Sequence, residues 1–221
     1  MADRWATFDC YGTLIDWNGG ILRELERLFG VRDAPRLLER YHSLEPDVQR
    51  EAYRSYREVL TLTLERLAEE EGLSIPEGET DALAKALPGW EPFAEVPPAL
   101  EELRRRGWQL AILSNSDRDL IAASREQIGV PFDRSIVAED VRSYKPSHAH
   151  WEEFFARTGA EPGQHVHIGA SLFHDIAPAN ELGLPSVWIN RLGEEAGDPP
   201  PTRELSDLSG LPDALDDLVP A

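Results

Sequence analysis

The stretch Phe8-Asp9-Cys10-Tyr11-Gly12-Thr13-Leu14 follows directly on an apolar run near the start of the chain. Trp5 to Phe8 predicts a short buried strand, so Asp9 would stand just past the end of that strand. In an open parallel sheet, residues beyond the carboxyl ends of the strands line the ligand-binding crevice. Asp9 is therefore a candidate nucleophile, and the alternative is that it only caps the turn. The polar residues elsewhere in the chain distinguish between these two roles.

The formal net charge of −19 over 221 residues opposes binding to nucleic acid or to an anionic membrane surface, and we predict neither partner. A small anionic substrate stays compatible with this charge, because a local pair of cations outweighs a distant field that salt screens. No apolar run approaches the length of a membrane span, and Met1 to Arg4 lack the basic and apolar regions of a signal peptide. We expect a soluble, cytoplasmic protein.

Cys10 is the only cysteine, which excludes an intrachain disulfide and a cysteine-rich zinc site. Its place beside Asp9 suggests cysteine catalysis, but no base lies close to it in the sequence. A buried cysteine usually behaves as a small hydrophobic residue. We therefore favour Asp9 over Cys10 as the nucleophile.

Residues 16–92 show helical spacing and almost no alternation. The apolar pattern predicts a first helix that ends at Gly30, a second around Leu37 to Tyr41, a third from Pro46 to Gly72, and a fourth from Asp81 to Leu87. Helices with short connections and apolar faces of this kind indicate a small helical bundle.

After Pro97 and Pro98 the pattern changes to helices and strands in alternation, which is typical of right-handed βαβ units on a parallel sheet. Further strands are predicted at 108–113, 135–138, 165–168 and 186–189, an irregular loop at 193–210, and a last helix at 212–218. The predicted fold is α/β: a doubly wound, Rossmann-like parallel sheet with an inserted helical-bundle cap. The core comprises residues 1–15 and 93–221, and the cap comprises residues 16–92. An insert at this position would emerge beside Asp9 and cover a site there.

Polar residues stand after several predicted strands, either directly at the strand end or in the connection that follows it. They are Asp9 with Tyr11 and Thr13, then Ser114 and Asn115, then Lys145, and then Ser171 to Asp175. Each group alone has an ordinary explanation as a turn, a surface lysine or a helix-start charge. Together they supply a nucleophile, neutral donors, a cation and a second carboxylate, which is the set that a nucleophilic hydrolase needs.

These stretches resemble the four motifs of the haloacid dehalogenase superfamily, in order and over nearly the whole chain. Motif one is matched by Asp9 to Leu14, motif two by Ser114-Asn115, motif three by Lys145-Pro146, and motif four by Gly169 to Asp175. The predicted helical insert matches the cap of the superfamily in position.

Two departures select a reaction within the superfamily. Its magnesium-dependent phosphatases carry a second Asp, a general acid, where this chain has Tyr11, and an Asp that holds magnesium where it has Ala170. Phosphoryl transfer loses its acid and a metal ligand by these changes. Loss of halide needs neither, because halide leaves as a stable anion. The resemblance therefore points to the metal-independent 2-haloacid dehalogenases, with a small haloacid as substrate and no cofactor or metal.

The resemblance also implies roles for the motif residues. Asp9 would attack the halogen-bearing carbon and form an ester that water then hydrolyses. Lys145 and Thr13 would hold Asp9, while Asp175, supported by Ser171, would orient or deprotonate the water. Ser114 and Asn115 would bind the substrate carboxylate or a developing oxyanion, together with the backbone amides near Cys10 and Tyr11.

A halide-accepting cation is expected from the cap, and Arg40 stands at the best-matching position, with Arg54 and Arg57 in reserve. The alternative is that Arg40 is an ordinary solvated helix charge. The chain has Trp151 where well-known dehalogenases have an aromatic hydroxyl, and His174 could compensate for missing polar groups in motif four or simply cap its helix. His165 and His167 share one side of their strand, and no carboxylate partner for them is evident from the sequence.

Two alternative functions stay open at this point. The chain could be a phosphatase with an atypical metal site, or a non-catalytic binding member that keeps the fold. Retention of Asp9, Lys145 and Asp175 argues against the second of these. Related dehalogenases are often dimers through the cap, so the formation of a homodimer is a separate open question.

Overall fold

The computed structural model describes residues 3–220, so the outermost ends of the predicted core, residues 1–2 and 221, lie outside the described residues. Within this range the six strands form one all-parallel sheet in the order β3-β2-β1-β4-β5-β6. The strands are β1 (Arg4–Phe8), β2 (Trp108–Ser114), β3 (Arg134–Val137), β4 (His165–Gly169), β5 (Ser186–Ile189) and β6 (Arg203–Leu205).

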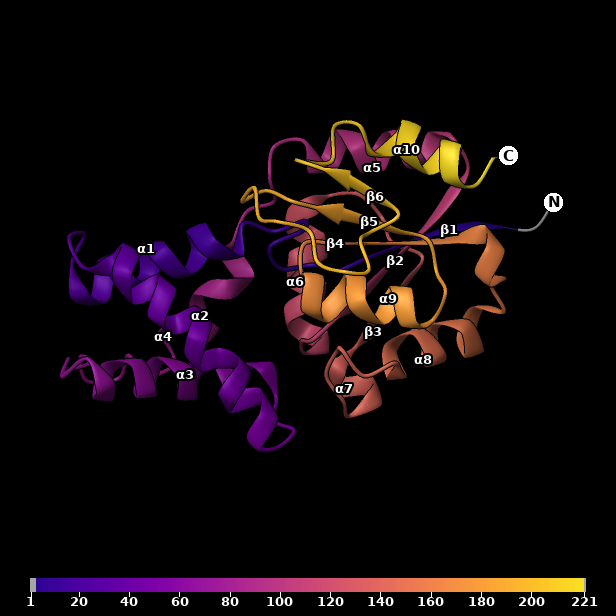
Figure 1. Cartoon of the computed structure of the whole chain (residues 1–221). Coiled ribbons are helices and arrows are strands. Elements are labelled where there is room, and N and C mark those ends of the chain that lie inside the picture. Colours follow the sequence, from indigo (N-terminus) through magenta and orange to yellow (C-terminus); the bar gives the residue numbers. More distant parts are fainter. Residues whose placement is uncertain (1–2, 221) are drawn as a thin grey trace.

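Helices cover both faces of the sheet, which confirms the doubly wound α/β fold (Figure 1). On one side lie α5 and α10, and on the other α8 and α9. The core helices are α5 (Val96–Arg105), α6 (Arg118–Ile128), α7 (Ala138–Val141), α8 (Ala149–Thr158), α9 (Ala177–Glu181) and α10 (Leu211–Leu218). None of the helices described is long and apolar enough to span a lipid bilayer.

The strand order places the site. The chain moves from β1 outward through β2 to β3, then returns to β4 on the other side of β1 and continues outward to β6. The direction of winding therefore changes between β1 and β4, and an open α/β sheet binds its ligands in the crevice at such a switch point. Asp9 follows β1 and the segment from Ala170 follows β4, so both border this crevice.

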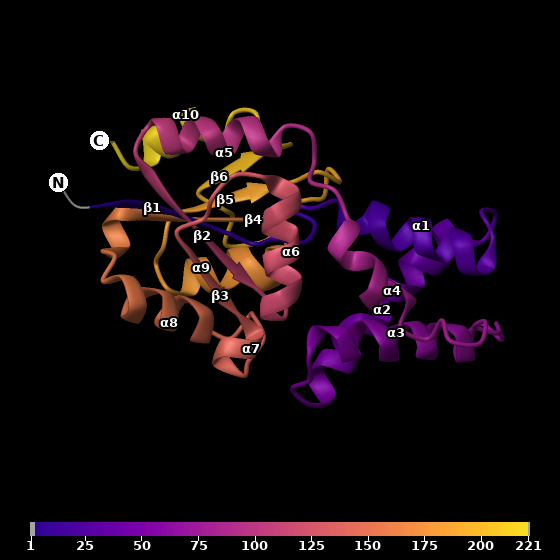
Figure 2. The ribbon, with the colours of Figure 1, turned by 180° about the vertical axis from the view of Figure 1, so that it is seen from behind.

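The cap consists of helices that stand apart from the sheet, as both views show (Figure 2). They are α1 (Trp17–Phe29), α2 (Ala34–Glu51), α3 (Tyr56–Glu70) and α4 (Ala82–Ala86). The two chain crossings run side by side: Asp16 N donates to Glu91 O at 3.0 Å, and Phe93 N donates to Leu14 O at 3.1 Å. We propose the cap boundaries at 15/16 and 92/93.

The helix boundaries in the cap differ from the prediction. Instead of one helix from Pro46 to Gly72, α2 runs through Pro46 to Glu51 and α3 begins at Tyr56. The break comes from a capping box, in which Ser55 Oγ accepts from Glu58 N at 3.3 Å and Glu58 Oε2 accepts from Ser55 N at 2.9 Å. The Ser-x-x-Glu spacing was present in the sequence as a start signal.

The segment predicted as an irregular loop, 193–210, contains the edge strand β6. Only three residues form it, so no alternation of apolar and polar residues could reveal it. Its place in the sheet depends on pairing with β5, and Asn190 N donates to Leu205 O at 2.8 Å just beyond that pairing.

Candidate active site

The loop after β1 fixes the candidate nucleophile. Gly12 has φ of +87°, a backbone conformation that a side chain disfavours, and this allows the tight turn in which Leu14 N donates to Cys10 O at 2.8 Å. The turn brings Thr13 Oγ1 within 2.9 Å of Asp9 Oδ2, to which it donates. Thr13 Oγ1 also accepts from Ala170 N at 2.9 Å, so one hydroxyl connects motifs one and four.

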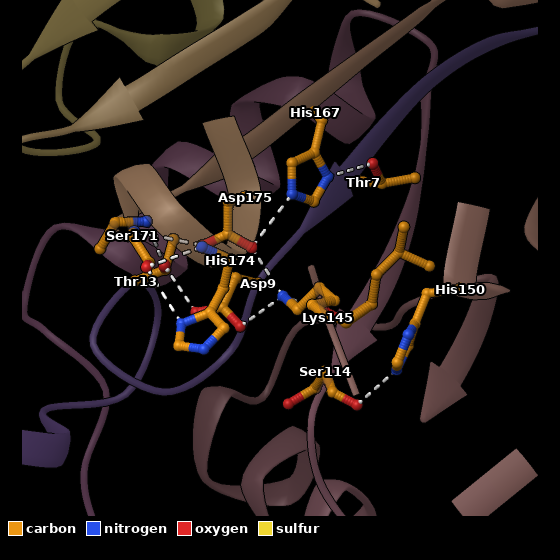
Figure 3. A network of polar contacts seen from close by, with 12 residues as sticks. Thr7, Asp9, Thr13, Ser114, Lys145, His150, His167, Ser171, His174 and Asp175 are labelled. Atoms are coloured by element: carbon orange, nitrogen blue, oxygen red, sulfur yellow. Dashed lines mark hydrogen bonds and ion pairs between the residues drawn. The ribbon is translucent and has the colours of Figure 1, made fainter. Parts of the chain in front are cut away.

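Lys145 lies between the two carboxylates (Figure 3). Its Nζ donates to Asp9 Oδ1 at 2.9 Å, to Asp175 Oδ1 at 2.6 Å and to Leu113 O at 2.8 Å. The ammonium thus uses its three hydrogens within the protein. Burial alone would lower the pKa of Lys145, but the two carboxylates outweigh burial and hold that pKa above its usual value.

Asp9 is the carboxylate of this cluster that is easier to protonate. Burial raises the pKa of Asp9 to about 6, against the lowering effect of Lys145 and with a further rise from the negative charge of Asp175. The side chain keeps 15% of its surface exposed, whereas the Asp175 side chain has none. Asp9 is therefore the carboxylate that can meet a substrate.

Asp175 is locked by contacts on both oxygens. Besides Lys145, its Oδ1 lies 3.3 Å from His167 Nε2, and its Oδ2 accepts from Ser171 N at 3.2 Å. Gly169 makes room for it, because a Cβ at that position would lie 2.4 Å from the Asp175 carboxyl carbon. Burial favours the neutral acid, but Lys145 and His167 outweigh burial and hold the pKa of Asp175 far below its usual range.

The expectation that His167 lacks a carboxylate partner is wrong. The partner is Asp175, because the loop after β4 folds so that its carboxylate contacts the His167 ring. His165 and His167 do share one side of β4, since Thr7 Oγ1 lies 2.8 Å from a ring nitrogen of each. Burial lowers the pKa of both rings, so both are neutral at neutral pH.

Asn115 holds the backbone of Lys145 in place. Its Oδ1 accepts from Lys145 N at 2.6 Å and its Nδ2 donates to Lys145 O at 3.1 Å. Ser114 is buried at the end of β2, and its carbonyl contacts His150 Nε2 at 3.1 Å. Both residues line the cavity over Asp9.

That cavity, of about 260 Å³, lies between the core and the cap. From the core, its wall includes Asp9, Tyr11, Ser114, Asn115, Lys145, Ser171, His174 and Asp175. From the cap, it includes Trp17, His42, Glu45, Pro46, Gln49 and Tyr56. The Tyr11 ring stacks on the Tyr56 ring with centroids 5.7 Å apart, which joins core and cap at the mouth of the site.

Comparison with known proteins agrees with this geometry. The family model described as haloacid dehalogenase-like hydrolase matches residues 4–183. The chain belongs to the haloacid dehalogenase-like hydrolase family. It is 31% identical to an (S)-2-haloacid dehalogenase of a Pseudomonas species over 87% of this chain and 86% of that protein. It is 27% identical to (S)-2-haloacid dehalogenase 4A of Burkholderia cepacia over 98% of this chain and 94% of that protein.

Among solved structures, a crystal structure of an L-2-haloacid dehalogenase superposes with a TM-score of 0.88 at 24% identity. The match covers 98% of this chain and 100% of that one. It confirms that this haloacid dehalogenase-like hydrolase has the predicted fold along its whole described length.

Arg40 does not reach the cavity of this hydrolase. Its Nε donates to Glu70 Oε2 at 2.9 Å and its Nη1 to Ser43 Oγ at 3.0 Å, on the outer surface of the cap. The structure thus places the guanidinium against a glutamate on α3 and not beside the nucleophile, and its role as halide acceptor stays a prediction. The reserves Arg54 and Arg57 are also engaged elsewhere, the first with Val48 O and the second with Asp119.

Cap residues that sequence reasoning missed form the roof instead. His42, Glu45 and Gln49 recur at the i, i+3 and i+7 positions of α2, which puts them on one face, but the bundle-facing residues of α2 share this spacing. Burial raises the pKa of Glu45 to about 7, with hydrogen bonds from Tyr56 and Gln49 opposing the rise. Burial lowers the pKa of His42, which stacks on Trp17 at 5.1 Å.

Arg191 is a cation near the nucleophile that was also missed. It follows β5 and lines a second cavity, of about 410 Å³, that also includes Asp9. Its Nη2 donates to Thr13 O at 2.9 Å and pairs with Glu95 at 2.7 Å, and its guanidinium lies 3.6 Å from the Phe93 ring centroid. Its place just after a predicted strand was the available signal, since polar residues after parallel strands line the ligand-binding crevice.

Cys10 is fully buried and is not part of the cavity wall, and burial raises the pKa of its thiol well above the usual value. Cys10 therefore carries no thiolate at neutral pH. The binding role of the backbone amides of Cys10 and Tyr11 stays a prediction.

The donor set described here does not fit magnesium. Mg²⁺ needs near-octahedral oxygen ligands, but the space between Asp9 and Asp175 holds the Lys145 ammonium, and Ala170 offers no side-chain oxygen. Within residues 3–220, no group of three or more His, Cys, Asp or Glu side chains is arranged to hold a metal ion.

Proposed function

We propose that this hydrolase converts short 2-haloalkanoic acids to 2-hydroxy acids through an ester on Asp9. The observation that carries the proposal is Asp9 held by Lys145 and Thr13 in a cavity whose acid and metal-ligand positions are Tyr11 and Ala170. The relatives, which are (S)-2-haloacid dehalogenases, support the same reaction class.

In the first step Asp9 Oδ attacks the halogen-bearing carbon from the side opposite the halogen. The carbon–halogen bond breaks as the carbon–oxygen bond forms, and the halogen leaves with the electron pair as halide. The carbon is inverted. Burial makes Asp9 a stronger nucleophile than a solvated carboxylate, and Lys145 and Thr13 keep it ionised and aimed.

In the second step water attacks the Asp9 carbonyl carbon, and the bond from that carbon to the ester oxygen breaks; this oxygen, formerly Asp9 Oδ, leaves on the product, and the water oxygen replaces it on Asp9. The products are the 2-hydroxy acid and a regenerated Asp9. Ser114 and Asn115, with backbone amides of the Asp9 loop, bind the substrate carboxylate, and Ser171 and Asp175 support the loop of motif four.

The test is halide release from 2-chloropropionate in EDTA, compared between the wild type and Asp9→Asn. We expect turnover in the wild type and none in the variant. Magnesium-dependent release of phosphate from a phosphomonoester, without halide release, would instead support the phosphatase alternative. A protein that does neither while binding the haloacid would be the non-catalytic member.

A further inference from the structure

Hydrolysis of the proposed Asp9 ester needs a group that accepts a proton from water. Asp175 is poorly suited to this task. Its side chain has no exposed surface, and its two oxygens are engaged by Lys145, His167 and Ser171 N. Its strongly lowered pKa also makes it a weak base.

His174 lies in the same cluster and lines the cavity with Asp9 (Figure 3). Its ring is oriented by one hydroxyl, since Ser171 Oγ accepts from His174 N at 3.0 Å and lies 3.1 Å from His174 Nδ1. With the proton on Nδ1, donated to Ser171 Oγ, the lone pair of Nε2 is free. In the described part of the chain no group hydrogen-bonds that nitrogen.

The ring also has the protonation state that a base needs. Burial lowers the pKa of His174, so the neutral form prevails at neutral pH. The ring is only half-buried, whereas His150, His165 and His167 are buried inside the core. Water can therefore reach His174 from the cavity.

We propose that His174 is the general base of ester hydrolysis, a role that rests on the proposed function. Nε2 takes a proton from water as the water oxygen bonds to the Asp9 carbonyl carbon. The tetrahedral intermediate then expels the ester oxygen, formerly Asp9 Oδ, which receives that proton from His174 and leaves as the hydroxyl of the product. Asp9 is left as the acid and releases its proton to solvent. Asp175 acts as a positioning residue through Lys145 and Ser171 N.

The two half-reactions separate this role from a structural one, because loss of halide needs no base. His174→Asn keeps a polar group near Ser171 but lacks Nε2. The matched control is His148→Asn, since His148 pairs with Glu181 outside the cavity. Each protein is mixed with excess 2-chloropropionate and quenched in acid, and chloride and intact mass are measured over time.

For His174→Asn we expect one chloride per chain at nearly the wild-type rate, followed by turnover slowed by about 10²- to 10⁴-fold. The chain should gain the mass of a propionate ester, located on Asp9 by peptide mass spectrometry. His148→Asn should behave as the wild type. Ser171→Ala removes the hydroxyl that holds Nδ1 of the ring and also the acceptor of His174 N. It should show the same burst with a smaller slowing, and it serves if His174→Asn does not fold.

Unchanged steady-state turnover in His174→Asn would overturn the base assignment and leave the proposed function standing. So would a slowed first phase with no ester, which is the result of a merely structural role. Absence of chloride from the wild type would instead overturn the proposed function, and the base role with it.

Discussion

Replacement of Lys145 by Met tests the electrostatics of the site most directly. The side chain of Lys145 is 1% exposed, and its ammonium donates to Asp9 and Asp175 at 2.9 and 2.6 Å. Methionine fills a similar volume without charge. The variant therefore leaves two buried carboxylates without their cation, with little change in packing.

The size of the effect follows from the pKa of Asp9, which is about 6 in the intact cluster. A nearby cation lowers a carboxyl pKa by roughly 1 to 3, so its removal should place the pKa of Asp9 at about 7 to 9. At pH 7 the ionised fraction then falls from about nine-tenths to between about a half and a hundredth. We expect the halide burst at pH 7 to slow by about 2- to 100-fold and to recover as the pH rises.

The sign of this dependence is fixed by the charge of the nucleophile. Only the ionised carboxylate attacks, so the burst is lost below the pKa of Asp9 and is complete above it, and the variant should move the midpoint upward. The variant should also lose about 3 to 5 kcal/mol of unfolding free energy, as expected when one partner of a buried ion pair is removed.

The assay is rapid-quench halide release between pH 5 and pH 10, with chemical denaturation at pH 7 for stability. Lys85→Met is the matched control, because Lys85 is 61% exposed on the cap and pairs only with Asp81 among acidic side chains of the described chain. A Lys145→Met burst with the wild-type rate and midpoint would refute the assigned role of Lys145.

Two further predictions concern the cap. Glu45 is neutral below about pH 7 and ionised above it. KM for a haloacid should therefore rise several-fold between pH 6 and pH 8.5, because the cavity gains negative charge. Glu45→Gln should abolish that rise, and a rise in KM that persists in the variant would contradict the prediction. Arg40→Ala should change kcat and KM less than about twofold and the unfolding free energy by at most about 1 kcal/mol, because its pair with Glu70 is exposed. A large loss of halide release in steady-state kinetics would show that Arg40 does reach the substrate.

The core half of the site could be predicted because it obeys a local rule. Asp9, Ser114 and Asn115 come directly after apolar runs, and parallel strands bring such ends to one edge of the sheet. Lys145 and Asp175 lie further from their strands; they were candidates from the same rule, and the resemblance to the superfamily supplied their roles. Their contacts through Lys145 Nζ then follow from the shared edge.

The cap half could not be predicted in the same way. On α2, residues that face the cavity lie among the apolar residues that face the bundle, so periodicity alone does not separate His42 and Glu45 from the bundle core. The direction of Arg40 depends on Glu70, thirty residues later in the chain. Likewise, the contact of His167 with Asp175 depends on how the loop after β4 returns to the sheet. These are tertiary contacts without a local sequence signal.

The charge balance of the cluster gives Asp175 a part in the first step, although it is not free to act as a base. Before reaction, Asp9 and Asp175 share one cation, and the charge of Asp175 is one of the causes that raise the pKa of Asp9. In the proposed mechanism, alkylation would turn Asp9 into a neutral ester, so the repulsion between the two carboxylates would disappear as the halide carries the charge away. The same repulsion that makes Asp9 easier to protonate therefore favours its attack on carbon. Lys145 limits the repulsion enough to keep Asp9 ionised at neutral pH, and relief of the remaining repulsion would favour formation of the proposed ester.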